Sequence, residues 1–186
     1  MAVARLKEKF ETQILESLKQ QFHVKNSMAV PRLEKVVVSM GVGKAIGDMK
    51  ILESAMADLA RITGQQPLMT RSKKAISNFK LREDMPIGCK VTLRRAKMYE
   101  FIDRLVNITL PRIRDFNGVS FKAFDEQGNY TLGISDQSIF PEIDPGRIKF
   151  TQGMDITFVF NHGPKEQTQE VLRQLGMPFR KKTTQG

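Results

Sequence analysis

The element most suggestive of chemistry is a glycine-rich turn between an apolar strand and a helix, VVVSMGVGKAIGD at residues 36–48. Turns of this kind can hold phosphate at a helix N-terminus. A P-loop, however, requires glycine and Ser/Thr at the positions of Val38 and Ala45. The dinucleotide fingerprint requires its last two glycines three residues apart, whereas Gly43 and Gly47 are separated by four. The pattern excludes a nucleotide site and leaves two alternatives, a simple tight turn or backbone N–H contacts to RNA phosphate.

Other residue types that perform catalysis or bind metals are too scattered to form a site. His23 and His162 are isolated, and Cys89 is the only cysteine, so no set of zinc ligands is predicted. The carboxylate pairs at 83–84 and 125–126 lie in polar turns, where solvation keeps them ionised. We therefore expect no enzyme, no catalytic residue, no metal, no cofactor and no small-molecule substrate.

Basic residues are concentrated in one stretch, Arg71–Arg95, which holds eight of them against two acidic residues. Its first part is rich in Ser, Asn, Asp, Pro and Gly and is typical of a long loop. Its second part alternates, with Cys89, Val91 and Leu93 on one side and Lys90, Thr92 and Arg94 on the other. A strand with one apolar face and one cationic, hydroxyl-bearing face indicates binding of a polyanion.

The overall charge agrees with a nucleic-acid partner. The 186 residues include 30 Lys and Arg against 20 Asp and Glu, a net charge of +10 with a pI near 9.9. The alternative is a basic face that is merely solvated. A single cysteine predicts a reducing compartment, and the lack of a signal-peptide pattern or long apolar run predicts a cytoplasmic protein without a membrane contact.

Apolar spacing predicts the elements that position these residues. Leu6, Phe10, Ile14, Leu18 and Phe22 recur every fourth residue and indicate an amphipathic N-terminal helix. Further helices are predicted between Asp48 and Gly64, from about Lys97 to Pro111, and over 164–175. Strands are predicted at 33–40, 67–73, 88–95, 119–124 and 130–134, and as a strand pair or one long bent strand at 148–160.

This order predicts an α+β fold, a two-layer sandwich in which helices pack on one face of an antiparallel or mixed sheet and leave the other face for RNA. We expect one domain over residues 1–186, with a β-rich, acidic sub-region at about 115–160. Residues 115–144 contain six acidic side chains and only one basic side chain, Lys122. Such a segment is expected to face solvent or a basic protein rather than phosphate.

Five segments, in order, resemble the bacterial large-subunit ribosomal protein number five family: VPRLEKVVVSMGVG, LARITGQQPLMTRSKKA, PIGCKVTLRR, LPRIRDFNG and IFPEID. The resemblance covers nearly the whole chain. It implies a non-enzymatic constituent of the large subunit that binds 5S rRNA and helps attach it in the central protuberance. It also implies contacts with the peptidyl-site tRNA, 23S rRNA and a basic small-subunit protein at an intersubunit bridge.

The resemblance also implies site residues. The residues implied for 5S rRNA binding are Ser39, Met40, Gly41, Gln65, Lys90, Thr92 and Arg94. The residues implied for tRNA binding are Arg71, Lys73, Lys74, Ser77, Asn78, Lys80 and Arg82. The residues implied for the bridge are Asp136, Glu142 and Asp144. Ser39 stands where the family pattern leads us to expect asparagine.

Aromatic side chains divide into two groups. Phe121, Phe124, Phe150, Phe158 and Phe160 follow strand patterns and are interpreted as mostly core, whereas an exposed Phe79 in the basic loop could stack on a base. The alternative function is a free RNA chaperone or regulatory RNA-binding protein, which would not sediment with large subunits.

Overall fold

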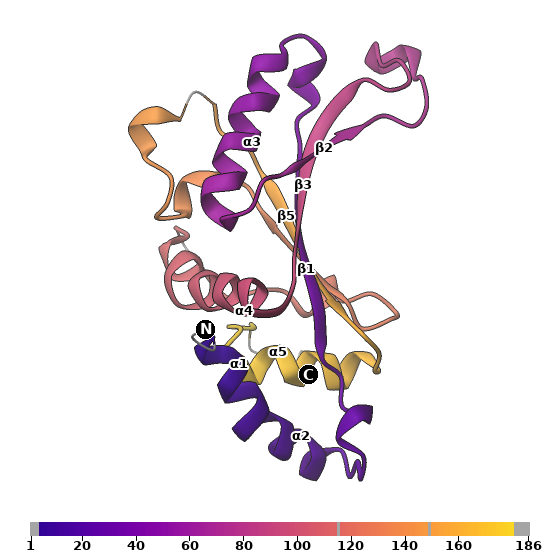
Figure 1. Ribbon diagram of the computed structural model, residues 1–186, viewed down its shortest axis with the longest axis vertical. Coiled ribbons are helices and arrows are strands. Elements are labelled where there is room, and N and C mark those ends of the chain that lie inside the picture. Colours follow the sequence, from indigo (N-terminus) through magenta and orange to yellow (C-terminus); the bar gives the residue numbers. More distant parts are fainter. Residues whose placement is uncertain (1–3, 115, 149, 181–186) are drawn as a thin grey trace, which may run out of the picture. The chain divides into compact units, whose positions relative to one another are not determined.

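The computed structural model describes residues 4–114, 116–148 and 150–180 (Figure 1). The N-terminal helix consists of α1 (Arg5–Lys9), a π turn (Phe10–Ile14) and α2 (Leu15–Gln21). Next come β1 (Leu33–Gly41), α3 (Met49–Thr63), β2 (Leu68–Arg71), β3 (Pro86–Leu93), α4 (Arg95–Arg104), β4 (Tyr130–Ile134), β5 (Met154–Phe160) and α5 (Lys165–Gln174).

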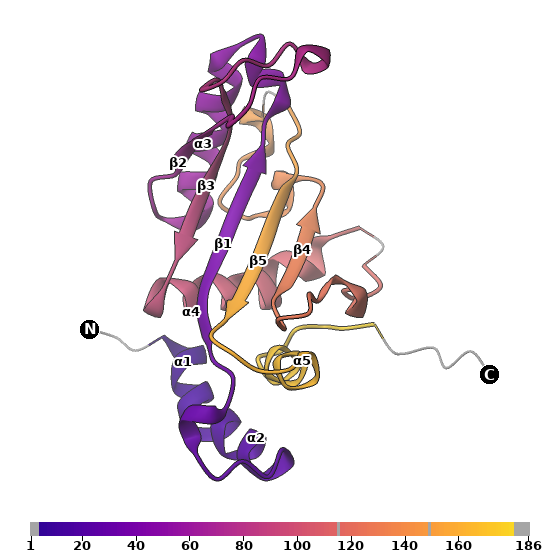
Figure 2. The same ribbon diagram turned by 90° about the vertical axis from the view of Figure 1, so that its right-hand side faces the viewer.

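The strands form one antiparallel sheet in the order β2-β3-β1-β5-β4 (Figure 2). In the β2–β3 pair, Leu68 lies opposite Lys90 and Thr70 lies opposite Gly88. Helices together with an antiparallel sheet confirm the predicted α+β class.

The chain divides into two compact units. The terminal unit comprises Met1–Val36, Arg94–Leu132 and Thr157–Gly186, and the central unit comprises Val37–Leu93 and Gly133–Ile156. Strands β1, β4 and β5 each contribute residues to both units. The single domain over 1–186, with its acidic sub-region, stays a prediction.

In the central unit, α3 packs on β3 through the buried side chains Leu52, Ala55, Leu59 and Ile62. The sequence signals at both ends of this helix operate as predicted. The Asp48 carboxylate accepts a hydrogen bond from the Lys50 backbone N–H at 2.9 Å, and Gly64 ends the helix in the left-handed region at φ 64°.

In the terminal unit, the predicted stripe of the N-terminal helix is buried at Leu6, Phe10, Ile14 and Leu18. This helix contacts α4, and the rings of Phe10 and Tyr99 have centroids 6.5 Å apart. Helix α4 continues through a π turn (Leu105–Thr109) and a 3-10 turn (Leu110–Arg112). The predicted third helix is therefore confirmed.

The predicted strand at 119–124 is wrong. Val119 and Phe124 form only isolated bridges, to Phe179 and to Tyr130, and residues 121–123 form a 3-10 turn. The adjoining turn is as expected, because the Asp125 N–H donates to the Asn129 carbonyl at 2.9 Å. Among the described residues of the segment 148–160, the structure has one strand, β5, which begins at Met154.

Cys89 is buried in the central unit, 1% exposed, and this burial raises the pKa of its thiol to about 11. The thiol therefore keeps its proton at pH 8, where the reactive thiolate is the minor form. We expect an aromatic disulfide reagent at pH 8 to label the folded protein far more slowly than the same protein in concentrated urea. Equal labelling rates would contradict the core position of this side chain.

Candidate nucleic-acid interface

The central unit presents a sheet face that α3 does not cover. Alternation along β1 and β3, together with the β2–β3 register, places one set of residues on this open sheet face. Its members are Ser39, Gly41, Leu68, Thr70, Gly88, Lys90 and Thr92. The face thus combines one exposed ammonium group, three short hydroxyl side chains, two glycines and one exposed leucine.

Most of the predicted 5S rRNA residues in the central unit are brought together here. Gly41 and Lys90 are exposed, and Ser39 and Thr92 are half-buried. Met40 differs, because its side chain is only 2% exposed and points to the opposite face of β1. Any contact of Met40 with a ligand on the open sheet face would therefore involve its backbone.

Gln65 is held against the end of β3. Its side-chain Nε2 donates to the Thr92 carbonyl at 3.2 Å, and it directly follows Gly64, the residue that ends α3. The amide group is thereby fixed next to Thr92 rather than extending freely into solvent. This contact supports the grouping of these two residues.

Arg94 belongs to the terminal unit, although it follows β3 in the chain. Its Nη1 forms an ion pair with the Glu34 carboxylate at 2.8 Å, and both side chains are about half exposed. The hydrogen bond from Arg94 is the main cause that lowers the pKa of Glu34. An incoming phosphate would therefore share this guanidinium with a carboxylate.

Leu68 and Thr70 on β2 are members of the open sheet face that sequence reasoning missed. The Leu68 side chain is 64% exposed opposite Lys90, and Thr70 lies opposite Gly88. A strand as short as β2 has too few residues for its apolar alternation to show which side chains face the open side. The face of Leu68 and Thr70 follows only from the register in which β2 pairs with β3.

The basic loop, residues 72–85 between β2 and β3, is braced by its own backbone (Figure 1). Near its base, the Ser72 N–H donates to the Met85 carbonyl at 2.9 Å. Towards its tip, Ile76 and Leu81 exchange two backbone hydrogen bonds of 2.9 and 3.1 Å. The predicted long loop therefore has a defined hairpin-like course.

The basic loop exposes the side chains predicted to contact tRNA. Exposed members of that set are Lys73, Lys74, Ser77, Asn78, Lys80 and Arg82. Arg71, at the end of β2, forms an ion pair with Asp84 at 3.0 Å. Phe79 is 69% exposed, as required for stacking on a base.

The residues predicted for the bridge have local structural partners. The Asp136 carboxylate accepts from the Ser138 N–H at 2.7 Å, and the Asp144 carboxylate accepts from the Gly146 N–H at 3.0 Å. Both cap short 3-10 turns, a role that Asp in a turn commonly has. Glu142 is half-buried.

Family comparison identifies the chain. The family model described as ribosomal protein L5 matches residues 26–82, and a second model, for the C-terminus of the same ribosomal family, matches residues 86–179. The chain belongs to the ribosomal protein L5 family. Its identity to large ribosomal subunit protein uL5 of Clostridium acetobutylicum is 56%, over 95% of this chain and 98% of the relative.

Two further relatives, also named large ribosomal subunit protein uL5, have similar identity to this chain. The identity is 57% to the protein of Heliobacterium modesticaldum, over 96% of this chain and 99% of the relative. It is 55% to that of Clostridium botulinum strain Hall, over 94% of this chain and 97% of the relative.

As a ribosomal L5 protein, the chain is a structural constituent of the large ribosomal subunit, and its partners are rRNA and the ribosome. It is not an enzyme, and its location is the cytoplasmic ribosome. Within residues 4–114, 116–148 and 150–180, no cluster of three or more His, Cys, Asp or Glu side chains could hold a metal ion. Over the same residues, no helix is long and apolar enough to cross a membrane.

Proposed function

We propose that this ribosomal L5 protein binds 5S rRNA through the open sheet face and so helps to attach 5S rRNA in the central protuberance. The observation that carries the proposal is that Lys90, Thr92 and Ser39 share a face of the central unit that α3 leaves uncovered. The lysine neutralises phosphate, while short hydroxyls and backbone groups contact sugars and base edges.

The mixture of groups on the open sheet face suits recognition of RNA shape. A dense cluster of arginines would bind any polyanion, whereas this face offers one ammonium group among hydroxyls, glycine backbone and the exposed Leu68 side chain. If five to eight phosphates are neutralised by the whole protein, log affinity falls against log salt with a slope of roughly −4 to −7. Affinity is then dominated by charge, and selectivity by the uncharged groups.

The basic loop is proposed to contact the peptidyl-site tRNA. Its exposed lysines and arginine lie on a backbone that is already braced, so less ordering is needed when a phosphate backbone binds. Phe79 adds an exposed ring that can stack on an unpaired base.

For the intersubunit bridge, we propose that Asp136, Glu142 and Asp144 lie in the segment that meets a basic small-subunit protein. Asp144 is exposed while it caps its turn, and a carboxylate has lone pairs for more than one donor. The caps fix the direction of the Asp136 and Asp144 carboxylates, which favours a defined contact.

Two double variants test this division of roles. Thr92→Val with Arg94→Gln should weaken 5S rRNA binding about tenfold, because it removes one sheet hydroxyl and one cation. Lys73→Gln with Lys74→Gln should leave 5S rRNA affinity within about twofold and weaken tRNA contact on the ribosome. Filter binding with 5S rRNA and tRNA footprinting on reconstituted subunits measure the two effects.

Thermal unfolding is the control for both double variants. The Lys73 and Lys74 side chains are exposed, so the loop variant should unfold at the wild-type temperature. Equal weakening of 5S rRNA binding by the two double variants would refute the proposed separation of surfaces.

A further inference from the structure

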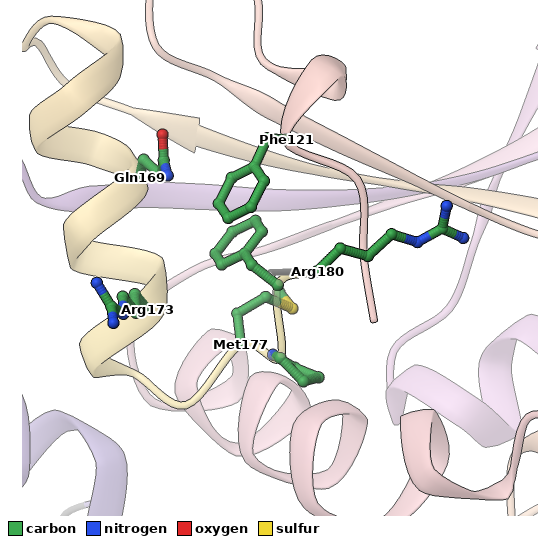
Figure 3. Close-up of a pocket in the computed structure, with 7 residues that line it drawn as sticks. Phe121, Gln169, Arg173, Met177 and Arg180 are labelled. Carbon is green, nitrogen blue, oxygen red and sulfur yellow. The ribbon is translucent and has the colours of Figure 1, made fainter. Parts of the chain in front are cut away.

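The terminal unit contains a hollow of about 470 Å³ with lining residues from three segments (Figure 3). Gln169 and Arg173 come from α5, Phe121 comes from the 3-10 turn, and Met177 and Arg180 come from the segment after α5. This volume lies within the range of small-ligand sites. None of these residues belongs to the open sheet face, the basic loop or the bridge residues.

One wall of the hollow is a pair of parallel aromatic rings. Phe121 stacks on Phe179 with centroids 4.9 Å apart and an interplanar angle of 14°. Phe179 is in turn packed against Phe124 and Tyr130, at 6.0 and 5.6 Å. Phe124, Phe158 and Phe160 are buried, as the sequence predicts for core residues. Phe121, which the sequence also predicts to be core, is only half-buried.

Residue 180 borders the hollow next to Phe179, but its side chain extends away from Gln169 and Arg173 (Figure 3). The Arg180 backbone N–H donates to the Val119 carbonyl at 3.1 Å, and its Nε donates to the Gly118 carbonyl at 2.9 Å. Gly118 permits this close approach, because a Cβ there would lie 2.9 Å from the Arg180 backbone nitrogen.

The α5 side of the hollow supplies a cation and an amide. The Arg173 side chain is 73% exposed, and its contact with Glu170 on the same helix is long, at 3.7 Å. Glu170 is less exposed, at 19%, but an ion pair of this length with a largely solvated arginine contributes little energy, so the guanidinium can turn to an incoming anion. Gln169 lies one helical turn from Arg173 and also lines the hollow (Figure 3).

We propose that this hollow binds a single unstacked nucleotide of ribosomal RNA, as an RNA contact additional to the open sheet face. The base stacks on the aromatic wall at Phe121, the Gln169 amide contacts the base edge, and Arg173 contacts the phosphate. Stacking on an aromatic ring together with guanidinium contacts is the usual means by which proteins hold an unpaired nucleotide.

A nucleotide fits the lining better than an acidic peptide does. A carboxylate would satisfy Arg173 but would leave the flat face of Phe121 and the amide of Gln169 unused. A nucleotide presents an anion, a polar edge and a planar ring, and the hollow has a partner for each of them.

A photo-cross-linking side chain at position 169 identifies the occupant in assembled large subunits. We expect cross-links to one nucleotide, and sequencing of the cross-linked RNA assigns it to 5S or 23S rRNA. Cross-links only to another protein or to this chain itself, or no cross-link, would overturn the proposal.

Binding measurements test the chemistry of the site. Phe121→Leu keeps an apolar side chain but removes the ring, and it should weaken binding to the cross-linked rRNA at least about fivefold. Phe121→Trp should retain wild-type affinity. Arg173→Gln should reduce the magnitude of the slope of log affinity against log salt by about one. Arg112 is an exposed arginine on another turn of the terminal unit, and Arg112→Gln should leave the rRNA affinity of this hollow unchanged.

Each variant is assayed separately with 5S rRNA and with 23S rRNA, after thermal unfolding has shown that it is folded. Wild-type affinity of Phe121→Leu for both RNAs, or equal losses in Phe121→Leu and Phe121→Trp, would overturn the stacked nucleotide. The outcome is separable from that for the open sheet face, because the Thr92 and Arg94 substitutions leave this hollow unchanged.

Discussion

Lys90→Glu should weaken 5S rRNA binding by about a hundredfold at low salt. Among the described residues of the open sheet face, Lys90 is the one cation, and it is exposed in the middle of the Gly88–Thr92 row. Reversal of its charge removes a phosphate contact and places a carboxylate against the RNA backbone, so the loss exceeds that of a neutral substitution. Filter binding over a range of salt concentrations measures the effect.

Two further variants isolate the position of the charge. Lys90→Gln should decrease the magnitude of the salt slope by about one, as expected for loss of one phosphate contact. Lys50→Glu makes the same change of charge on an exposed residue of α3, the helix that covers the other face, and should weaken binding much less. Equal losses from Lys90→Glu and Lys50→Glu would show that only the net charge matters and would contradict a site on the open sheet face.

The helices were predictable because their signals are local. Asp48 and Gly64 bound α3 as their chemistry requires, and a fourfold spacing of apolar residues predicted the buried stripe of the N-terminal helix. The alternation in β3 also held, since Cys89, Val91 and Leu93 are buried while Lys90 is exposed. The alternation of apolar and polar residues along β3 is sufficient to predict which of these side chains are buried.

The composition of the open sheet face was predicted in part. Its charged strand was evident from the sequence, but Met40 was grouped with Ser39 and Gly41 although alternate residues of a strand face opposite sides. Counting by two from buried Val38 would have placed the Met40 side chain in the core. The residues of β2 could not be placed, because their face depends on the register with β3.

The segment 119–124 shows where sequence patterns fail. Val119 and Phe124 are buried as in a strand, yet the backbone of Val119 pairs with the 178–180 segment, about 60 residues later in the chain. That long-range pairing, made possible by Gly118, leaves Phe121 in a 3-10 turn beside a hollow. Tertiary contacts of this kind leave no periodic trace in the local sequence.

Gly88→Ala should lower the free energy of unfolding by about 2–3 kcal/mol, as expected for overpacking in a closely packed sheet. A Cβ at Gly88 would lie 2.5 Å from the Met40 carbonyl oxygen and 3.0 Å from the Thr70 Oγ1. The first of these atoms is backbone, so the clash can be relieved only by moving β1 away from β3. Urea unfolding followed by circular dichroism measures the change.

Gly41→Ala is the matched control, because a Cβ at Gly41 meets no atom within 4 Å. We expect its free energy of unfolding to stay within about 1 kcal/mol of wild type. If Gly88→Ala is folded at low temperature, its 5S rRNA affinity should also fall, since a wider β1–β3 spacing separates Ser39 from Lys90. Unfolding curves that coincide for the two alanine variants would contradict the close approach of these strands. Gly88 therefore links stability to the proposed function, because the strand spacing that it permits also sets the geometry of the open sheet face.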